Sequence, residues 1–195
     1  MNIFLLPVKV IRYFRKTKFI RDFKYCARSS GFEGNCTFIG KENIFIGENT
    51  YIGPGCEIYA YNSHFQKQLC SELVIGNNVR FTSRCRITCA GKIILGNDVL
   101  VAPDVFITDH NHGTRPDSPG GYSKQPLTIK EVCVEDGVWL GQRVCVLPGV
   151  KIGKHSIIGA NSVVTHDVPE YCMAVGAPAK VIKRWNMEKQ EWERI

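Results

Sequence analysis

The sequence predicts an all-β protein built around a parallel β-helix, in which the chain coils through short parallel strands. The first observation is an aliphatic residue at every sixth position, unbroken at Val134, Leu140, Val146, Ile152, Ile158 and Val164. The same spacing occurs earlier, at Ile46/Ile52/Ile58, Ile75/Phe81/Ile87 and Leu95/Val101/Ile107. The second observation is that glycine follows the aliphatic residue at Gly141, Gly153 and Gly159. An α-helix, with 3.6 residues per turn, does not produce a period of six.

Three regions follow from this spacing. We expect a basic, helical N-terminal arm over residues 1–30, a β-helix over 31–174 and a capping segment over 175–195 that ends in a short helix. In the capping segment, Val181, Ile182 and Trp185 would dock on the last coil. Three hexapeptides make one triangular coil, and stacked coils satisfy their backbone hydrogen bonds in each other.

The period breaks twice inside the β-helix. Residues 108–130 contain many glycines and prolines, which predicts a projecting loop. Residues 59–72 also depart from the coil, and their role stays open, although they could reach over an acceptor site.

The N-terminal arm carries the whole net charge of +7. Residues 1–30 hold eight Lys or Arg and one acid, and the remainder is balanced. Aromatic and aliphatic residues interleave with these charges, so the arm either packs on the first coil or contacts an anionic membrane surface or an acidic glycan. We expect no nucleic-acid partner, although the charge alone would allow one. Its longest apolar run, Ile3–Val8, is too short to span a membrane and precedes the basic residues, unlike a secretory signal.

The nine cysteines predict a reducing compartment. Cys56 and Cys85 fall on small inward positions of the repeat, and no CxxC motif occurs. We therefore expect a cytoplasmic protein, with peripheral contact at the inner face of the membrane as an addition that the arm would supply.

The second half of the chain resembles the hexapeptide-repeat acyltransferases. The motifs that carry this resemblance are Val138-Trp139-Leu140-Gly141, Pro148-Gly149-Val150, Ile158-Gly159-Ala160, Ser162-Val163-Val164-Thr165, Asp167-Val168-Pro169 and Gly176-Ala177-Pro178-Ala179-Lys180. Within that family, the chain resembles the maltose and galactoside O-acetyltransferases and the sugar O-acetyltransferases of surface-polysaccharide biosynthesis. The resemblance implies a left-handed parallel β-helix, a homotrimer with active sites between subunits, and acetyl-CoA as co-substrate.

The resemblance places the catalytic base on His112, when Pro103-Asp104-Val105 is aligned without gaps. His110 remains the alternative, and Asp109 could orient either histidine. Histidine suits this role because it accepts a hydroxyl proton near neutral pH. No metal is expected, because the pair is spaced HxH and the remaining histidines, His64, His155 and His166, are scattered along the chain.

The resemblance also implies a groove for acetyl-CoA along the late coils. The matching positions are Gln142, Ala160, Thr165, His166, Lys180 and Lys183, with an oxyanion donor near Gly141 and Trp139 beside the acceptor site. Lysine in place of arginine still attracts phosphate but lacks the bidentate fork. Ordinary surface charge for the lysines, and packing for Trp139, are the alternatives. Arg84 is either a contact for an acidic acceptor or a solvated charge.

We therefore expect an acetyl-CoA-dependent O-acetyltransferase that acts on a sugar hydroxyl of a surface-polysaccharide or lipopolysaccharide precursor by direct attack. An acetyltransferase for an amino sugar or for serine, and a non-catalytic β-helix scaffold, are the alternatives. The loop histidines together with Thr165 and Lys180 favour the enzyme, because a scaffold has no use for them. The acceptor sugar is left open.

Overall fold

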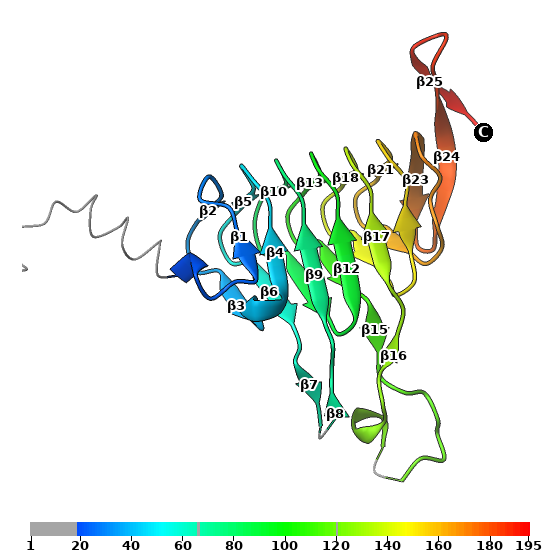
Figure 1. Ribbon diagram of the computed structural model, residues 1–195. Coiled ribbons are helices and arrows are strands. Elements are labelled where there is room, and N and C mark those ends of the chain that lie inside the picture. Colours follow the sequence, from blue (N-terminus) through cyan, green and yellow to red (C-terminus); the bar gives the residue numbers. More distant parts are fainter. Residues whose placement is uncertain (1–18, 66, 120) are drawn as a thin grey trace, which may run out of the picture.

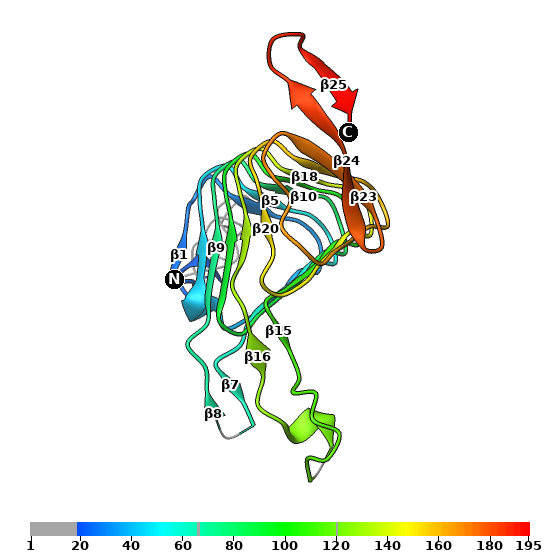
Figure 2. The same cartoon turned by 90° about the vertical axis from the view of Figure 1, so that its right-hand side faces the viewer.

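The chain winds through three parallel sheets that form the sides of a prism (Figures 1 and 2). The computed structural model describes residues 19–65, 67–119 and 121–195. Sheet A consists of β1 (Tyr25–Cys26), β4 (Ile44–Ile46), β9 (Glu72–Ile75), β12 (Lys92–Leu95), β17 (Val132–Val134) and β20 (Lys151–Ile152). Sheet B consists of β2 (Gly31–Phe32), β5 (Tyr51–Ile52), β10 (Arg80–Phe81), β13 (Leu100–Val101), β18 (Trp139–Leu140), β21 (Ile157–Ile158), β23 (Cys172–Gly176), β24 (Ala179–Asn186) and β25 (Glu191–Arg194). Sheet C consists of β3 (Thr37–Ile39), β6 (Glu57–Ala60), β11 (Arg86–Cys89), β14 (Phe106–Thr108), β19 (Cys145–Val146) and β22 (Val163–Val164).

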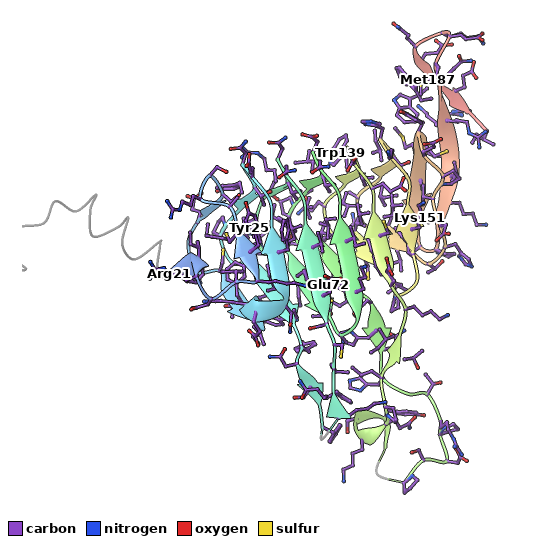
Figure 3. All side chains as sticks on the ribbon, viewed as in Figure 1. Arg21, Tyr25, Glu72, Trp139, Lys151 and Met187 are labelled. Carbon is purple, nitrogen blue, oxygen red and sulfur yellow. The ribbon has the colours of Figure 1, made fainter. Side chains whose placement is uncertain are left out.

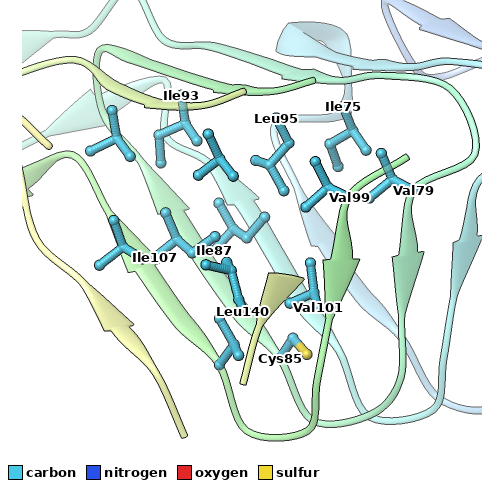
Figure 4. Close-up of a cluster of buried hydrophobic side chains, with 14 of the residues drawn as sticks. Ile75, Val79, Cys85, Ile87, Ile93, Leu95, Val99, Val101, Ile107 and Leu140 are labelled. Atoms are coloured by element: carbon cyan, nitrogen blue, oxygen red, sulfur yellow. The ribbon is translucent and has the colours of Figure 1, made fainter. Parts of the chain in front are cut away.

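The core consists of aliphatic side chains stacked in columns along the prism (Figure 4). Each two-residue strand points one residue inward, most of the longer strands point two inward, and these lie in register with their counterparts in the next coil. The sheet C column, which is fully or almost fully buried, is Ile58, Ile87, Ile107, Val146 and Val164. These residues belong to the predicted six-residue spacing. The parallel β-helix is therefore confirmed, because that spacing returns one residue to each column in every coil.

Both breaks in the period fall at the same corner of the prism, where the chain passes from a sheet C strand to a sheet A strand. The first break forms a hairpin of β7 (Ser63–His64) and β8 (Lys67–Gln68). The second forms a loop with β15 (His110–Asn111), the short helix η3 (Tyr122–Lys124) and β16 (Thr128–Ile129). Both project from one edge, side by side in the two views (Figures 1 and 2).

The C-terminal segment is a β-hairpin, so the predicted short helix is wrong. β23 and β24 pair antiparallel and extend sheet B, and β24 pairs in turn with β25. The alternating exposure of β24 is the pattern of a strand, and Trp185 and Trp192 pack across the hairpin with ring centroids 5.4 Å apart. Val181 packs against the core, whereas Ile182 is exposed rather than docked.

The β-helix begins before the expected boundary at residue 31, because β1 already pairs with β4. Cys26, Phe32 and Phe38 lie in register with Ile46, Ile52 and Ile58 and so continue the six-residue spacing backward. The six-residue spacing was not recognised in this coil because cysteine and phenylalanine occupy the positions that aliphatic residues hold elsewhere. Phe19 and Phe23 pack on Phe32 and Phe38 and cover the open end of the core.

The predicted arm lies largely outside the described residues, which begin at 19. Its helical character, its membrane contact and the cytoplasmic location stay predictions. Within the described ranges, no helix is long and apolar enough to cross a membrane. The nine cysteines are free thiols, and Cys56 and Cys85 are buried as their positions in the repeat predicted. A short helix, η2 (Lys41–Asn43), joins β3 to β4.

Two adjacent isoleucines of β12 test the inward column. Ile93 is fully buried, whereas its neighbour Ile94 points outward and is half-buried. Replacing Ile93 with Ala should lower the free energy of unfolding by about 2–5 kcal/mol, because it leaves a cavity in the core. Ile94→Ala should cost clearly less in the same urea titration. An equal loss for both variants would contradict the assignment of the inward face.

Candidate active site

The 108–130 loop is held as a defined structure at its base. β15 and β16 pair antiparallel, with His110 opposite Ile129, and the Lys130 N–H donates to the Asp109 carbonyl at 2.8 Å. Further out, the buried Gln125 side chain accepts from the Arg115 N–H at 3.0 Å and donates to its carbonyl at 2.7 Å. These bonds close the loop on itself, so the side chains it carries have fixed places.

Asp109 anchors the loop to the neighbouring coil. Its side chain is fully buried and accepts backbone N–H bonds from Ala90 at 2.8 Å and Gly91 at 2.7 Å, as well as a contact from His110. Burial acts to raise the pKa of this carboxyl, but the bonds from His110 and from the two N–H groups outweigh it. The Asp109 pKa therefore lies below its ordinary value, and the group is a carboxylate at neutral pH.

The same carboxylate orients His110. Nδ1 of His110 lies 2.8 Å from Oδ1 of Asp109, and the histidine side chain is only 14% exposed. Because a carboxylate only accepts, Nδ1 carries the proton in this contact, and Nε2 of a neutral ring is left as the basic nitrogen. The Tyr61 ring packs edge-on against His110, with centroids 5.8 Å apart. A carboxylate that fixes one tautomer of a histidine is a recurring arrangement for general bases.

His112 directly follows β15 and is more exposed than His110. Its ring centroid is 5.4 Å from that of His64, which the β7–β8 hairpin brings to the loop. His64 donates from Nε2 to the Gln125 carbonyl at 3.2 Å and so ties the hairpin to the loop. A pocket of about 210 Å³ forms between the two insertions, lined by Tyr61, Ser63, His64, Leu69, His110, His112 and Leu127. The hairpin and the loop therefore share one site, which we call the histidine pocket.

Sequence reasoning left open whether residues 59–72 reach an acceptor site, and it missed the place of His64. His64 was expected to be scattered from the HxH pair, but it lies beside His112. The position of the two breaks within the repeat could have predicted that the hairpin and the loop lie close together. Both breaks follow a sheet C strand, so both must leave the prism at one corner. Even with His64 present, the described part of the chain contains no group of three or more His, Cys, Asp or Glu that could hold a metal ion.

The residues predicted to bind acetyl-CoA lie on two edges of the prism. Gln142 and Ala160 occupy successive turns between sheets B and C, where the Asn161 N–H donates to the Gln142 carbonyl at 2.8 Å. Thr165 and His166 follow β22, at the corner of the prism between sheets C and A. The 108–130 loop leaves the prism at this same corner, two coils earlier. The Thr165 hydroxyl lies 2.8 Å from Nδ1 of His166. One protomer therefore does not join these residues in a single groove.

The remaining predicted positions lie near the late part of sheet B. Lys180 and Lys183 lie on β24, with Lys180 exposed and Lys183 half-buried. Trp139 is 47% exposed on the outer face of β18 and is labelled in Figure 3. Gly141 donates its backbone N–H to the Ile158 carbonyl at 2.8 Å, so that N–H does not serve as an oxyanion donor.

Arg84 is neutralised within the protein. Its guanidinium forms a bidentate pair with Asp104, at 2.7 and 3.1 Å, and its side chain stays 62% exposed, so Arg84 is a solvated charge with a partner in the protein. The pair lowers the pKa of the Asp104 carboxyl, chiefly through the hydrogen bond from Arg84.

Comparison with known proteins agrees with this fold. Residues 134–166 match the family described as bacterial transferase hexapeptide (six repeats). WbbJ of Escherichia coli, named for O-acetyl transfer in lipopolysaccharide biosynthesis, is 35% identical over 165 residues, which cover 82% of this chain and 81% of that protein. The galactoside O-acetyltransferase of Lactococcus lactis is 37% identical over 145 residues, covering 72% of this chain and 63% of that protein. The solved structure of AntD, an N-acyltransferase from Bacillus cereus in complex with coenzyme A and a dTDP-amino sugar, matches with a TM-score of 0.72 at 17% identity, over 90% of this chain and 91% of that one.

These matches define the class of protein as acyltransferases built on a left-handed parallel β-helix. The chain belongs to the hexapeptide-repeat transferase family, to which the resemblance of its late coils had assigned it.

The buried Asp109 carboxylate gives a test of how the loop is anchored. Asp109→Asn should lower the free energy of unfolding by about 2 kcal/mol at pH 7. The amide carries no charge, and its NH₂ group cannot accept a bond from one of the two backbone N–H groups that the carboxylate binds. The lowered pKa of Asp109 means that its stabilisation is complete above its ordinary pKa and is lost as the pH falls through the lowered value.

The difference between wild type and Asp109→Asn should therefore shrink as urea titrations are taken below about pH 4. A difference that stayed constant with pH, or was absent at pH 7, would contradict the anchoring role.

Proposed function

We propose that this chain is an acetyl-CoA-dependent O-acetyltransferase that acts on a sugar hydroxyl in a precursor of a surface polysaccharide or lipopolysaccharide. The observation that carries the proposal is the histidine pocket, in which His110 and His112 face a cavity at the base of the projecting loop. The names of WbbJ and of the galactoside O-acetyltransferase support the acceptor class. The coenzyme A in the AntD structure supports the donor.

In the proposed reaction, His112 takes the proton from the acceptor hydroxyl. The hydroxyl oxygen attacks the thioester carbonyl of acetyl-CoA, a C–O bond forms and the C–S bond breaks. The proton held by the histidine passes to the departing thiolate of coenzyme A, so that an acetyl ester and a free thiol result. A base positioned for this step contributes about 10²–10⁴ in rate.

A specific observation favours a second assignment of the base. His110, and not His112, has its tautomer fixed by a buried carboxylate, at 2.8 Å from Asp109. In that assignment Nε2 of His110 takes the hydroxyl proton, and Asp109 is a positioning residue. His112 is then a neighbour that shapes the pocket together with His64.

The split of the predicted cofactor positions supports a homotrimer. Gln142 and Ala160 lie at one edge of sheet C, and Thr165 and His166 lie at the other, so a groove with both sets needs two copies of the chain. Lys180 and Lys183 carry charges that suit the phosphates of coenzyme A, and Trp139 presents an exposed ring on sheet B. We include acetyl-CoA binding between subunits in the proposal.

An acetyltransferase for an amino sugar or serine remains the alternative enzyme, and a scaffold the alternative class. A thiol-release assay with acetyl-CoA separates them when sugars, amino sugars, nucleotide sugars and serine are offered in parallel. Release with hydroxyl sugars is the expected result. Release only with amines or serine, or none with any acceptor, would contradict the proposal.

Three single variants decide between the two histidines. If His112 is the base, His112→Ala should lower kcat by about 10²–10⁴, while His110→Ala and Asp109→Asn have clearly smaller effects on kcat. If His110 is the base, His110→Ala should show the large loss and Asp109→Asn should reduce kcat and shift its pH profile. Near-normal rates for both histidine variants would contradict a histidine base. His155→Ala, on the far corner of the prism, is the matched control.

A further inference from the structure

A second and larger cavity lies between the two insertions. It has a volume of about 640 Å³ and is lined by His64, Phe65, Lys67, Gln68, Leu69, Cys70, Ala90, Gly91, Lys124, Gln125, Pro126, Leu127 and Ile129. The hairpin forms one wall and the 108–130 loop forms the other. A cavity of this size is within the range of small-molecule binding sites.

The cavity exists because the coil between the two insertions makes a short turn. Three successive coils pass from sheet C to sheet A at this corner. In the first coil the connection is residues 61–71, and in the second it is only Ala90 and Gly91. In the third coil the connection is the 108–130 loop. The two walls are thus two strand spacings apart at their base, about 9–10 Å. Ala90 and Gly91 form the floor.

The floor leaves no room for a larger side chain. A Cβ on Gly91 would lie 2.4 Å from Cγ2 of Ile129, which packs over it from the loop wall. The spacing of the coils therefore sets the distance between the walls, and the small size of Gly91 lets Ile129 pack directly on the floor.

The cavity adjoins the histidine pocket. His64, Leu69 and Leu127 line both spaces, so a ligand in the larger cavity reaches the side of the pocket where His110 and His112 lie. The arrangement suits an acceptor whose reacting hydroxyl enters the histidine pocket while its remainder occupies the larger cavity.

The charge of the lining selects the kind of acceptor. Lys67 and Lys124 are exposed on opposite walls, and the lining contains neither Asp nor Glu. Among the described residues neither lysine forms an ion pair, whereas Arg84 and Arg115 are paired with Asp104 and Asp117. The rest of the lining is largely apolar, including the exposed ring of Phe65 at the tip of the hairpin. Two unpaired cations over an apolar surface favour an anion with an apolar attachment.

We infer that the larger cavity is the acceptor subsite and that it binds a glycosyl phosphate, whose phosphate lies between Lys67 and Lys124. This inference rests on the proposed function and names its substrate class. The phosphate ester is the shared chemistry of two sources, a sugar nucleotide and a sugar on a prenyl phosphate. In both, the apolar lining would contact the group beyond the phosphate.

The test compares matched acceptors with matched variants. Methyl glycosides and the 1-phosphates of the same sugars are offered with acetyl-CoA to wild type, Lys67→Ala, Lys124→Ala and the double variant. Each substitution should reduce kcat/KM for glycosyl phosphates about tenfold, since a bond to a charged group is lost, and should leave the neutral glycosides unchanged. Lys189→Ala, on the distant C-terminal hairpin, should alter neither.

Two results would overturn the inference. One is an equal loss on neutral and phosphorylated acceptors, and the other is no loss on the phosphates. Sugar nucleotides and short prenyl diphosphate sugars form two further arms, and the arm with the higher kcat/KM identifies the source of the phosphate.

A binding readout keeps this inference separate from the proposed function. Cys70 is exposed and lines the larger cavity, so a bound glycosyl phosphate should slow its alkylation by N-ethylmaleimide, measured by peptide mass spectrometry. Protection that is present in wild type and lost in the double lysine variant supports the subsite even if no acetyl transfer is found. Absence of protection in wild type, with acetyl transfer intact, would overturn the subsite alone.

Discussion

The in-register stacking of coils is the constraint on which the rest of the structure depends. Each inward aliphatic residue lies over its counterpart in the previous coil, and each backbone group bonds to the coil beside it. An insertion is tolerated only where the chain leaves the stack at a corner and returns to the same register. Because both insertions follow a sheet C strand, they emerge from one edge and meet. The place of the site is thus a consequence of the repeat.

Within that frame, one buried carboxylate connects the stack to the chemistry. Asp109 bonds to the backbone of Ala90 and Gly91 in the neighbouring coil and to Nδ1 of His110 in the loop. The same two neighbouring residues form the floor of the larger cavity. His110, the cavity floor and the rigid prism are therefore coupled through a single side chain. A site on a projecting loop acquires in this way the positional precision of the sheet.

The sequence predicted the prism well because a six-residue spacing of aliphatic residues directly identifies the buried side chains. It also predicted the projecting loop, from its glycines and prolines, and the histidine pair within it. The prediction failed where the spacing was carried by other residue types, as at Cys26, Phe32 and Phe38. It failed again at the C-terminus, where residues 175–195 were expected to end in a short helix but form the strands Ala179–Asn186 and Glu191–Arg194. The approach of His64 to His112 depends on contacts between segments far apart in sequence, which no local pattern encodes.

If the hairpin and the loop together form one acceptor site on an otherwise independent prism, the prism should keep its fold when the hairpin is removed. The most direct test replaces residues 61–71 with the two-residue Ala-Gly turn that the next coil uses at Ala90 and Gly91. We expect a variant with wild-type urea stability and unchanged coenzyme A binding by calorimetry, but without acetyl transfer to any sugar that the wild type accepts. Full acetyl transfer by this variant, with the same acceptor preference as wild type, would contradict an acceptor site shared by the hairpin and the loop.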